Sequence, residues 1–218
     1  MRVLEENVNL VIAGAWNPAI LMPNWISEQA MRGAPGENFQ VQVELPVMNL
    51  GLNGQRPRFA FRGISVSSDP AALTFKLAYD DPAQVDLSIS TAANIIELLS
   101  HTPVSGVGFN FGFEFTEPSA DLLSTFGGTT FLPEAATDAD AALVRQEWTG
   151  VIKDGIRLIN VSASLEAGIV RFNINVHTEV RSAQAAVDAL RVQNLFRDIK
   201  NEVLCLINRF IVPLEIAA

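Results

Sequence analysis

The stretch VSGVGFNFGFEF, residues 104–115, decides how this chain folds. From Val107 onward every second position is apolar, and four of these are phenylalanine, whereas the positions between them hold glycine, asparagine or glutamate. Side chains that alternate with a period of two residues predict a β-strand. One aromatic face and one nearly bare face indicate a central strand. We expect a helix to pack on the bare glycine face, with a ligand or a partner backbone as the alternative.

The residues before this stretch also show alternating apolar positions, which predict strands at residues 7–14, 39–45, 58–67 and 72–79. A bulge is expected at Gly63, where the apolar positions change face. A short helix is expected around Pro23. A second helix, capped by Ser90 or Thr91, is expected to end near Ser100.

The residues after this stretch repeat the same order of elements. A short helix is expected at residues 120–126, followed by strands near 142–152, 156–164 and 168–178. Asp154-Gly155 is a hairpin signal between the first two of these strands. A long helix is then expected over residues 182–211.

Each half of the chain therefore consists of a strand, a short helix, three strands and a helix. Local similarities support this, such as WNPAI at residues 16–20 against TEPSA at residues 116–120. We predict an α+β fold, in which a mainly antiparallel, curved sheet forms two pseudo-repeated halves and the long C-terminal helix packs on the sheet. Residues 1–218 are expected to form a single compact domain with pseudo-equivalent halves 1–102 and 103–218.

The composition indicates which partners and which cellular location to expect. Fifteen Lys and Arg residues against 24 Asp and Glu residues give a formal net charge of -9, which argues against binding to nucleic-acid phosphates. The N-terminal residues fit neither a signal peptide nor a membrane span, so we expect a cytoplasmic protein that does not associate with membranes. The single cysteine, Cys205, falls in an apolar helical pattern and is expected to be a buried, reduced thiol.

No familiar catalytic or cofactor-binding motif is found in the sequence. The glycines of residues 104–115 are spaced G-x-G-x-x-x-G within a strand, whereas a dinucleotide site needs G-x-G-x-x-G between a strand and a helix. His101 and His177 lack the spacing of metal ligands, and no serine or cysteine lies in a nucleophile motif. We therefore predict no catalytic residues, no metal site and no cofactor.

One polar row is a candidate binding surface. In residues 168–178 the apolar positions alternate with Arg171, Asn173, Asn175 and His177. Asn110 holds the equivalent place in the central strand, and further amides occur at Asn7, Asn9, Gln40 and Gln42. Amides donate and accept hydrogen bonds without carrying charge, so this face could bind a peptide, a sugar or a protein. The alternative is an ordinary solvated sheet face.

These features favour a non-catalytic interaction or assembly module, which is a subunit or adaptor that binds a protein partner or forms a homo-oligomer. One alternative is a small apolar-ligand-binding protein with a cavity between the sheet and the C-terminal helix. Another is an enzyme in which His177, Arg171 and nearby carboxylates converge only in the folded chain.

Overall fold

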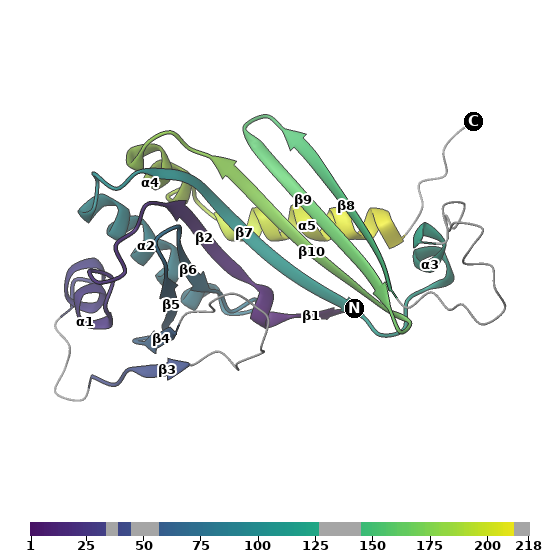
Figure 1. The fold of residues 1–218 in the computed structure, drawn as a ribbon, viewed down its shortest axis with the longest axis horizontal. Helices are drawn as coiled ribbons and strands as arrows, with labels where there is room; N and C mark the ends of the chain where they lie inside the picture. The colour runs from purple at the N-terminus through teal and green to yellow at the C-terminus, as the bar shows by residue number, and fades with distance from the viewer. Residues whose placement is uncertain (34–38, 45–56, 127–144, 212–218) are drawn as a thin grey trace.

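In the described residues of the computed structural model, ten β-strands form an antiparallel open sheet, and several helices make the fold α+β (Figure 1). The structure describes residues 1–33, 39–44, 57–126 and 145–211. In chain order, the strands are β1 (Arg2–Val3), β2 (Asn9–Gly14), β3 (Gln42–Glu44), β4 (Arg58–Phe61), β5 (Ile64–Ser68), β6 (Ala72–Lys76), β7 (Val104–Phe115), β8 (Arg145–Asp154), β9 (Arg157–Glu166) and β10 (Ile169–Glu179).

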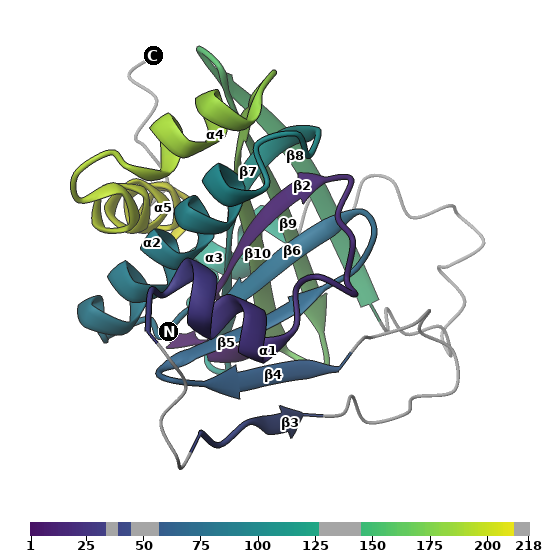
Figure 2. The ribbon, with the colours of Figure 1, turned by 90° about the vertical axis from the view of Figure 1, so that its left-hand side faces the viewer.

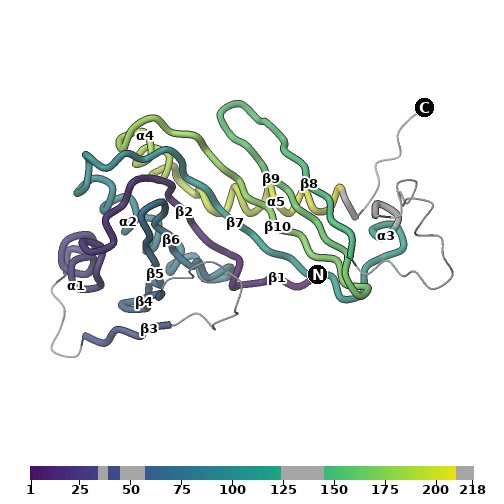
Figure 3. Tube along the Cα trace, viewed as in Figure 1, coloured from purple at the N-terminus to yellow at the C-terminus, as the bar shows by residue number. Residues whose placement is uncertain are grey.

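The strands are not ordered in space as they are in sequence. Across the sheet the order is β3-β4-β5-β6-β2-β7-β10-β9-β8, and β1 pairs on β7. Outward from the central β2–β7 pair, the neighbours are β6, β5 and β4 on one side, and β10, β9 and β8 on the other. Figure 3 shows β2 and β7 between these two groups of strands. Within the described residues, the two edges of the sheet are β3 and β8.

Helices cover one face of the sheet. Figure 2 shows α2 (Pro82–Leu98), α4 (Ala183–Leu190) and α5 (Leu195–Ile211) on the same side of the strands. The short α1 (Pro23–Trp25) runs into the π-helical turn η2 (Ile26–Ala30), which packs on α2. The short helix α3 (Ala120–Phe126) contacts α5, and the 3-10 turn η1 (Glu5–Asn7) joins β1 to β2.

The aromatic face of β7 lies at the centre of the hydrophobic core. Phe109, Phe111 and Phe113 are at most 2% exposed. The ring of Phe196, at the start of α5, lies 5.6 Å from the ring of Phe111 and 6.1 Å from that of Phe109. Burying a phenylalanine side chain stabilises a fold by about 1.5–3 kcal/mol because apolar surface is removed from water. The predicted central strand is confirmed.

Most of the other strands lie close to their predicted positions, but the single strand predicted at residues 58–67 is instead the hairpin of β4 and β5. The strand predicted near 142–152 is observed as β8, and those near 156–164 and 168–178 are β9 and β10. Residue 45 and residues 142–144, which we assigned to strands, lie outside the described residues.

The single helix predicted over residues 182–211 is divided into α4 and α5. Ser182 begins α4, and its hydroxyl oxygen accepts a hydrogen bond from the backbone N–H of Ala185 at 3.1 Å. Asn194 then adopts a left-handed conformation with φ of 59°, which does not occur inside a right-handed helix. This break lets α4 pack on α2 while α5 carries Phe196 over β7.

The helix that we expected to begin at Ser90 or Thr91 begins earlier, at Pro82. Asp81 is the capping residue, because its carboxylate accepts a hydrogen bond from the backbone N–H of Gln84 at 3.0 Å. Proline suits the first helical position because the N–H it lacks would have no partner there. Ser90 and Thr91 lie within α2, where both hydroxyls donate to backbone carbonyls about one turn earlier.

The structure corrects two predictions that were made at glycines, the bulge at Gly63 and the hairpin turn at Asp154-Gly155. Gly63 is not in a bulge, since Arg62 and Gly63, with φ of 47° and 80°, form the tight turn between β4 and β5. Two successive positive φ angles are typical of the turn that suits the twist of a hairpin. The turn between β8 and β9 lies one residue later than predicted, at Gly155 and Ile156, because Asp154 is still paired in β8.

Cys205 is exposed, contrary to the prediction of a buried thiol. It lies on α5 between Val203 and Ile207, which are at most 1% exposed and face the core. Positions two residues apart differ by about 200° around a helix axis. The buried side of α5 therefore turns Cys205 toward solvent.

Candidate functional site

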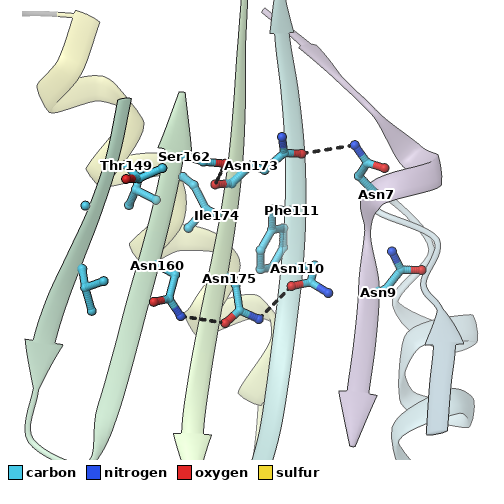
Figure 4. A pocket seen from close by; sticks show the side chains of 13 residues that line it. Asn7, Asn9, Asn110, Phe111, Thr149, Asn160, Ser162, Asn173, Ile174 and Asn175 are labelled. Atoms are coloured by element: carbon cyan, nitrogen blue, oxygen red, sulfur yellow. Dashed lines mark hydrogen bonds between the residues drawn. The ribbon is translucent and has the colours of Figure 1, made fainter. Parts of the chain in front are cut away.

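The predicted polar row of β10 lies beside matching amides on its neighbouring strands. Asn175 is paired directly with Asn110 of β7 and Asn160 of β9, and Asn110 is also paired with Asn9 of β2. Directly paired residues of antiparallel strands point to the same face of a sheet. These asparagines therefore form a transverse row across four adjacent strands (Figure 4). We call Asn9, Asn110, Asn175 and Asn160 the amide row.

Hydrogen bonds join three members of the amide row. The Nδ2 group of Asn160 donates to Oδ1 of Asn175 at 3.0 Å, and Nδ2 of Asn175 donates to Oδ1 of Asn110 at 2.7 Å. The Nδ2 group of Asn9 donates to the backbone carbonyl of Glu6 at 3.3 Å. Its Oδ1 atom is buried and has no hydrogen-bond partner among the described residues. A buried acceptor without a donor costs about 1–3 kcal/mol, so Asn9 retains unused capacity to accept a hydrogen bond.

A second pair of amides lies beside the amide row. The Nδ2 group of Asn7 donates to Oδ1 of Asn173 at 3.2 Å. This pair and the amide row, together with Thr149 and Ser162, line a hollow of ≈ 410 Å³ on the sheet (Figure 4). We call it the amide hollow. All of its lining side chains in the described part of the chain are uncharged, so the amide hollow is neutral, with apolar side chains beside its amides.

Arg171, at one end of the predicted row, is held in an ion pair. Its Nε atom donates to Oε2 of Glu114 at 2.9 Å, and the side chain of Glu114 is only 11% exposed. Arg2 approaches the same carboxylate at 3.8 Å. Because a nearly buried carboxylate requires a partner, Arg171 neutralises Glu114 here. It lies outside the described lining of the amide hollow.

His177 lies at the other end of the predicted row. It is six residues from Arg171 along β10, a separation of about 20 Å in a strand. It lines a different hollow, together with Lys153 and Glu179. The fold therefore does not bring His177 and Arg171 together, and the acid-base pair named in the enzyme hypothesis is not assembled at one site.

The bare glycine face of β7 is covered by the chain's own polar side chains. Each of three glycines lies under a residue of a neighbouring strand or turn: Gly106 under His177, Gly108 under Asn175 and Gly112 under Asn7. Our prediction that a helix packs on this face is wrong, because α2, α4 and α5 lie on the phenylalanine side of the sheet (Figure 2). The missing glycine side chains make room for the amides and the imidazole.

Sequence reasoning missed three polar side chains of the amide hollow, which are Thr149, Asn160 and Ser162. The alternation of β9 places Asn160 on the polar face of the strand, since its neighbours in sequence are apolar. That alternation does not say that Asn160 meets Asn175, because the contact depends on the register of the β9–β10 hairpin. Gln40 and Gln42, which we grouped with the amides, lie elsewhere, because β3 is at the far edge of the sheet.

The apolar-ligand alternative requires a cavity between the sheet and the C-terminal helix. In the structure, the ring of Phe196 occupies the space over Phe109 and Phe111. This alternative stays a hypothesis.

Among the residues that the structure describes, no three His, Cys, Asp or Glu side chains are grouped so as to hold a metal ion. None of the helices in those same segments is both long and apolar enough to cross a membrane. No protein-family model, curated protein or solved structure matches this chain. The candidate site therefore rests on the chain's own geometry.

Proposed function

We propose that this chain is a non-catalytic interaction module, a subunit or adaptor of a larger assembly, and that the amide hollow binds an uncharged, extended segment of a protein partner. The observation that carries this proposal is the amide row, whose members occupy directly paired positions on four adjacent strands. Asparagine is disfavoured in β-strands. A row of four in register is therefore better explained by binding than by folding.

The chemistry of the amide hollow fits a neutral polypeptide. Asparagine amides donate and accept hydrogen bonds, as do the peptide groups of an extended chain. Val151, which is 66% exposed, lies at the outer side of the hollow and offers apolar contact. Charged side chains are depleted at the cores of protein interfaces, and a neutral lining agrees with that composition.

The strand order supports a related proposal, that residues 1–102 and 103–218 are halves of an internal duplication within one curved, compact domain. In each half the first strand, β2 or β7, is followed across the sheet by the last three strands of an antiparallel series, in reverse chain order. In the first half these are β6, β5 and β4, and in the second they are β10, β9 and β8. The first half has β3 as an additional strand at the outer edge of its series.

Selection from a library of random linear peptides, displayed on phage, tests the binding proposal. We expect uncharged peptides to be enriched on the full chain. We expect them to bind an Asn175→Asp variant at least about tenfold more weakly, which corresponds to about 1.4 kcal/mol. The substitution removes the donor to Asn110 and places a charge in a neutral hollow. Affinities of the enriched peptides are measured by titration calorimetry.

The matched control is Asn201→Asp, which makes the same chemical change at an exposed position of α5. Peptide affinity should be unchanged in this variant, and thermal melting should show that both variants are folded. The proposal fails if no peptide is enriched, or if the enriched peptides bind the Asn175→Asp variant as tightly as the unmodified chain.

A further inference from the structure

Strand β8 is a long edge strand with exposed apolar side chains on both faces. Its 10 residues pair with β9 without interruption, and its other edge pairs with no described strand. Val151, on the side of the amide hollow, is 66% exposed, and Trp148 and Ile152, on the opposite side, are 46% and 41% exposed. Natural edge strands are usually short, bulged or interrupted by proline, because an open edge is a template for another strand. The opposite edge, β3, has only 3 residues.

We propose that β8 pairs with β8 of a second copy of this chain, in antiparallel orientation, about a twofold axis at Gly150. This goes beyond binding of a peptide segment, because the occupant is the chain itself and the surface is the sheet edge. A closed twofold contact uses the same surface on both copies. When the axis is perpendicular to the sheet, residues that point to the same face meet across it.

The charges of β8 select this register. With the axis at Gly150, Glu147 faces Lys153 of the second copy, and the twofold axis generates this pair twice. With the axis one residue earlier, Arg145 would face Lys153, a like-charge contact. With the axis one residue later, Glu147 would meet no charge. Opposite charges that face each other directly stabilise an antiparallel pair, whereas like charges destabilise it.

The two charged groups differ in their present ion pairs. Lys153 has no ion-pair partner within the described segments of the chain, and Glu147 is paired with Arg145 on its own strand. Arg145 also approaches Glu166 of β9 at 3.9 Å. The second copy therefore supplies the carboxylate that Lys153 lacks, and Glu147 comes to lie between two cations.

The same register pairs the apolar side chains and joins the two amide hollows. Trp148 faces Ile152 of the second copy, and pairs of aromatic with β-branched residues are favourable across strands. On the other face, Val151 meets Thr149 of the second copy. Both residues line the amide hollow at its β8 side. The two hollows would therefore become continuous across the axis.

Sedimentation equilibrium of the full chain over a concentration series tests this inference, with charge-reversed variants as the probe. We expect a dimer for the unmodified chain. Glu147→Lys or Lys153→Glu alone should weaken dimerisation at least about tenfold, because each places like charges in both symmetry-related contacts. The double variant should restore it. A mixture of the two single variants should form a heterodimer, since every contact then joins opposite charges.

The control is Arg197→Glu, a charge reversal at an exposed position of α5, which should leave the dimer unchanged. A chain that stays monomeric up to about 100 μM, a concentration at which a contact with a micromolar dissociation constant is mostly formed, would overturn the inference. So would a dimer that neither single variant weakens, because it must then use another surface. Circular dichroism of each variant separates loss of pairing from loss of folding.

Discussion

The two faces of β7 lie in opposite environments, one in the hydrophobic core and the other in a layer of polar side chains. On one face, Phe109, Phe111 and Phe113 are buried under the helices and pack against aromatic rings. On the other, glycines alternate with Asn110 and lie under polar side chains that meet through hydrogen bonds. The first face excludes water from a close-packed core. The second holds amide donors and acceptors in a hydrogen-bonded layer outside the core.

This contrast explains why the two faces differ so much in side-chain volume. A core gains stability from large apolar side chains, because each removes apolar area from water. A hydrogen-bonded surface gains little from volume, because an intramolecular hydrogen bond replaces one to water and nets only about 1 kcal/mol. Substitutions on the two faces should therefore have very different costs.

The largest effect is expected on the aromatic face. Phe111→Ala should lower the free energy of unfolding by about 3–5 kcal/mol, because it leaves a cavity under the ring of Phe196. The matched control is Asn110→Ala, one residue away on the other face, which removes the acceptor of a single hydrogen bond and should cost about 1 kcal/mol. Urea denaturation measures both. Equal losses would contradict the difference that we draw between the faces.

A middle-sized effect is expected where the polar face is closely packed. A Cβ at Gly112 would lie 2.6 Å from Cβ of Asn7, a backbone-proximal atom that cannot swing away. Gly112→Ala should therefore cost about 1–3 kcal/mol. At Gly108, the nearest atom is the terminal Nδ2 of Asn175 at 3.0 Å. Gly108→Ala should therefore cost less. Urea denaturation measures both losses in the free energy of unfolding, and a larger loss for Gly108→Ala would contradict this steric explanation of the glycines.

The smallest effect is expected at high pH, on the helix side of the sheet. The ring of Tyr79 lies 6.4 Å from that of Phe113, and Nζ of Lys200 lies 3.5 Å from its centroid. Burial, followed by the negative charge of Asp80, raises the pKa of Tyr79 above its ordinary value of 10.0. The unfolded chain therefore loses its phenol proton at a lower pH than the folded chain. Tyr79's contribution to stability is complete below pH 10.0 and is lost as pH rises through the raised pKa.

Tyr79→Phe should remove this part of the alkaline loss of stability, while the ring and its packing stay in place. Tyr79 is the single tyrosine of the chain, so the ultraviolet absorbance of tyrosinate reports its ionisation alone. The denatured chain provides the reference titration. A folded-state titration at or below the denatured one would contradict the expected direction.

Much of the secondary structure follows from local patterns. The alternation of residues 104–115 predicts β7 on its own, and Ser182 caps α4 at the predicted place. The errors occur where one local sequence pattern is compatible with two backbone conformations. The helix expected to begin at Ser90 or Thr91 begins at Pro82, and Gly63, which was expected in a bulge, forms a turn. In both cases the backbone conformation depends on what the following residues pack against.

The candidate site was only half predictable. Asn173, Asn175 and Asn110 were visible as polar positions in alternating strands, and they do line the amide hollow. Arg171 and His177 share that alternation but lie at the two ends of β10. There Arg171 pairs with Glu114, and His177 lines a different hollow. Period-two alternation identifies the face of a residue. The alternation does not show how far along the strand a residue lies from the candidate site.

The sequence by itself determined which residues face the core and which face away, because that choice is local and repeats every two residues. The tertiary structure alone decided that Asn9, Asn110, Asn175 and Asn160 meet in one row. That row depends on strand order and register across segments far apart in the chain. Order and register follow from how the helices bury all the apolar faces at once, which no single segment specifies.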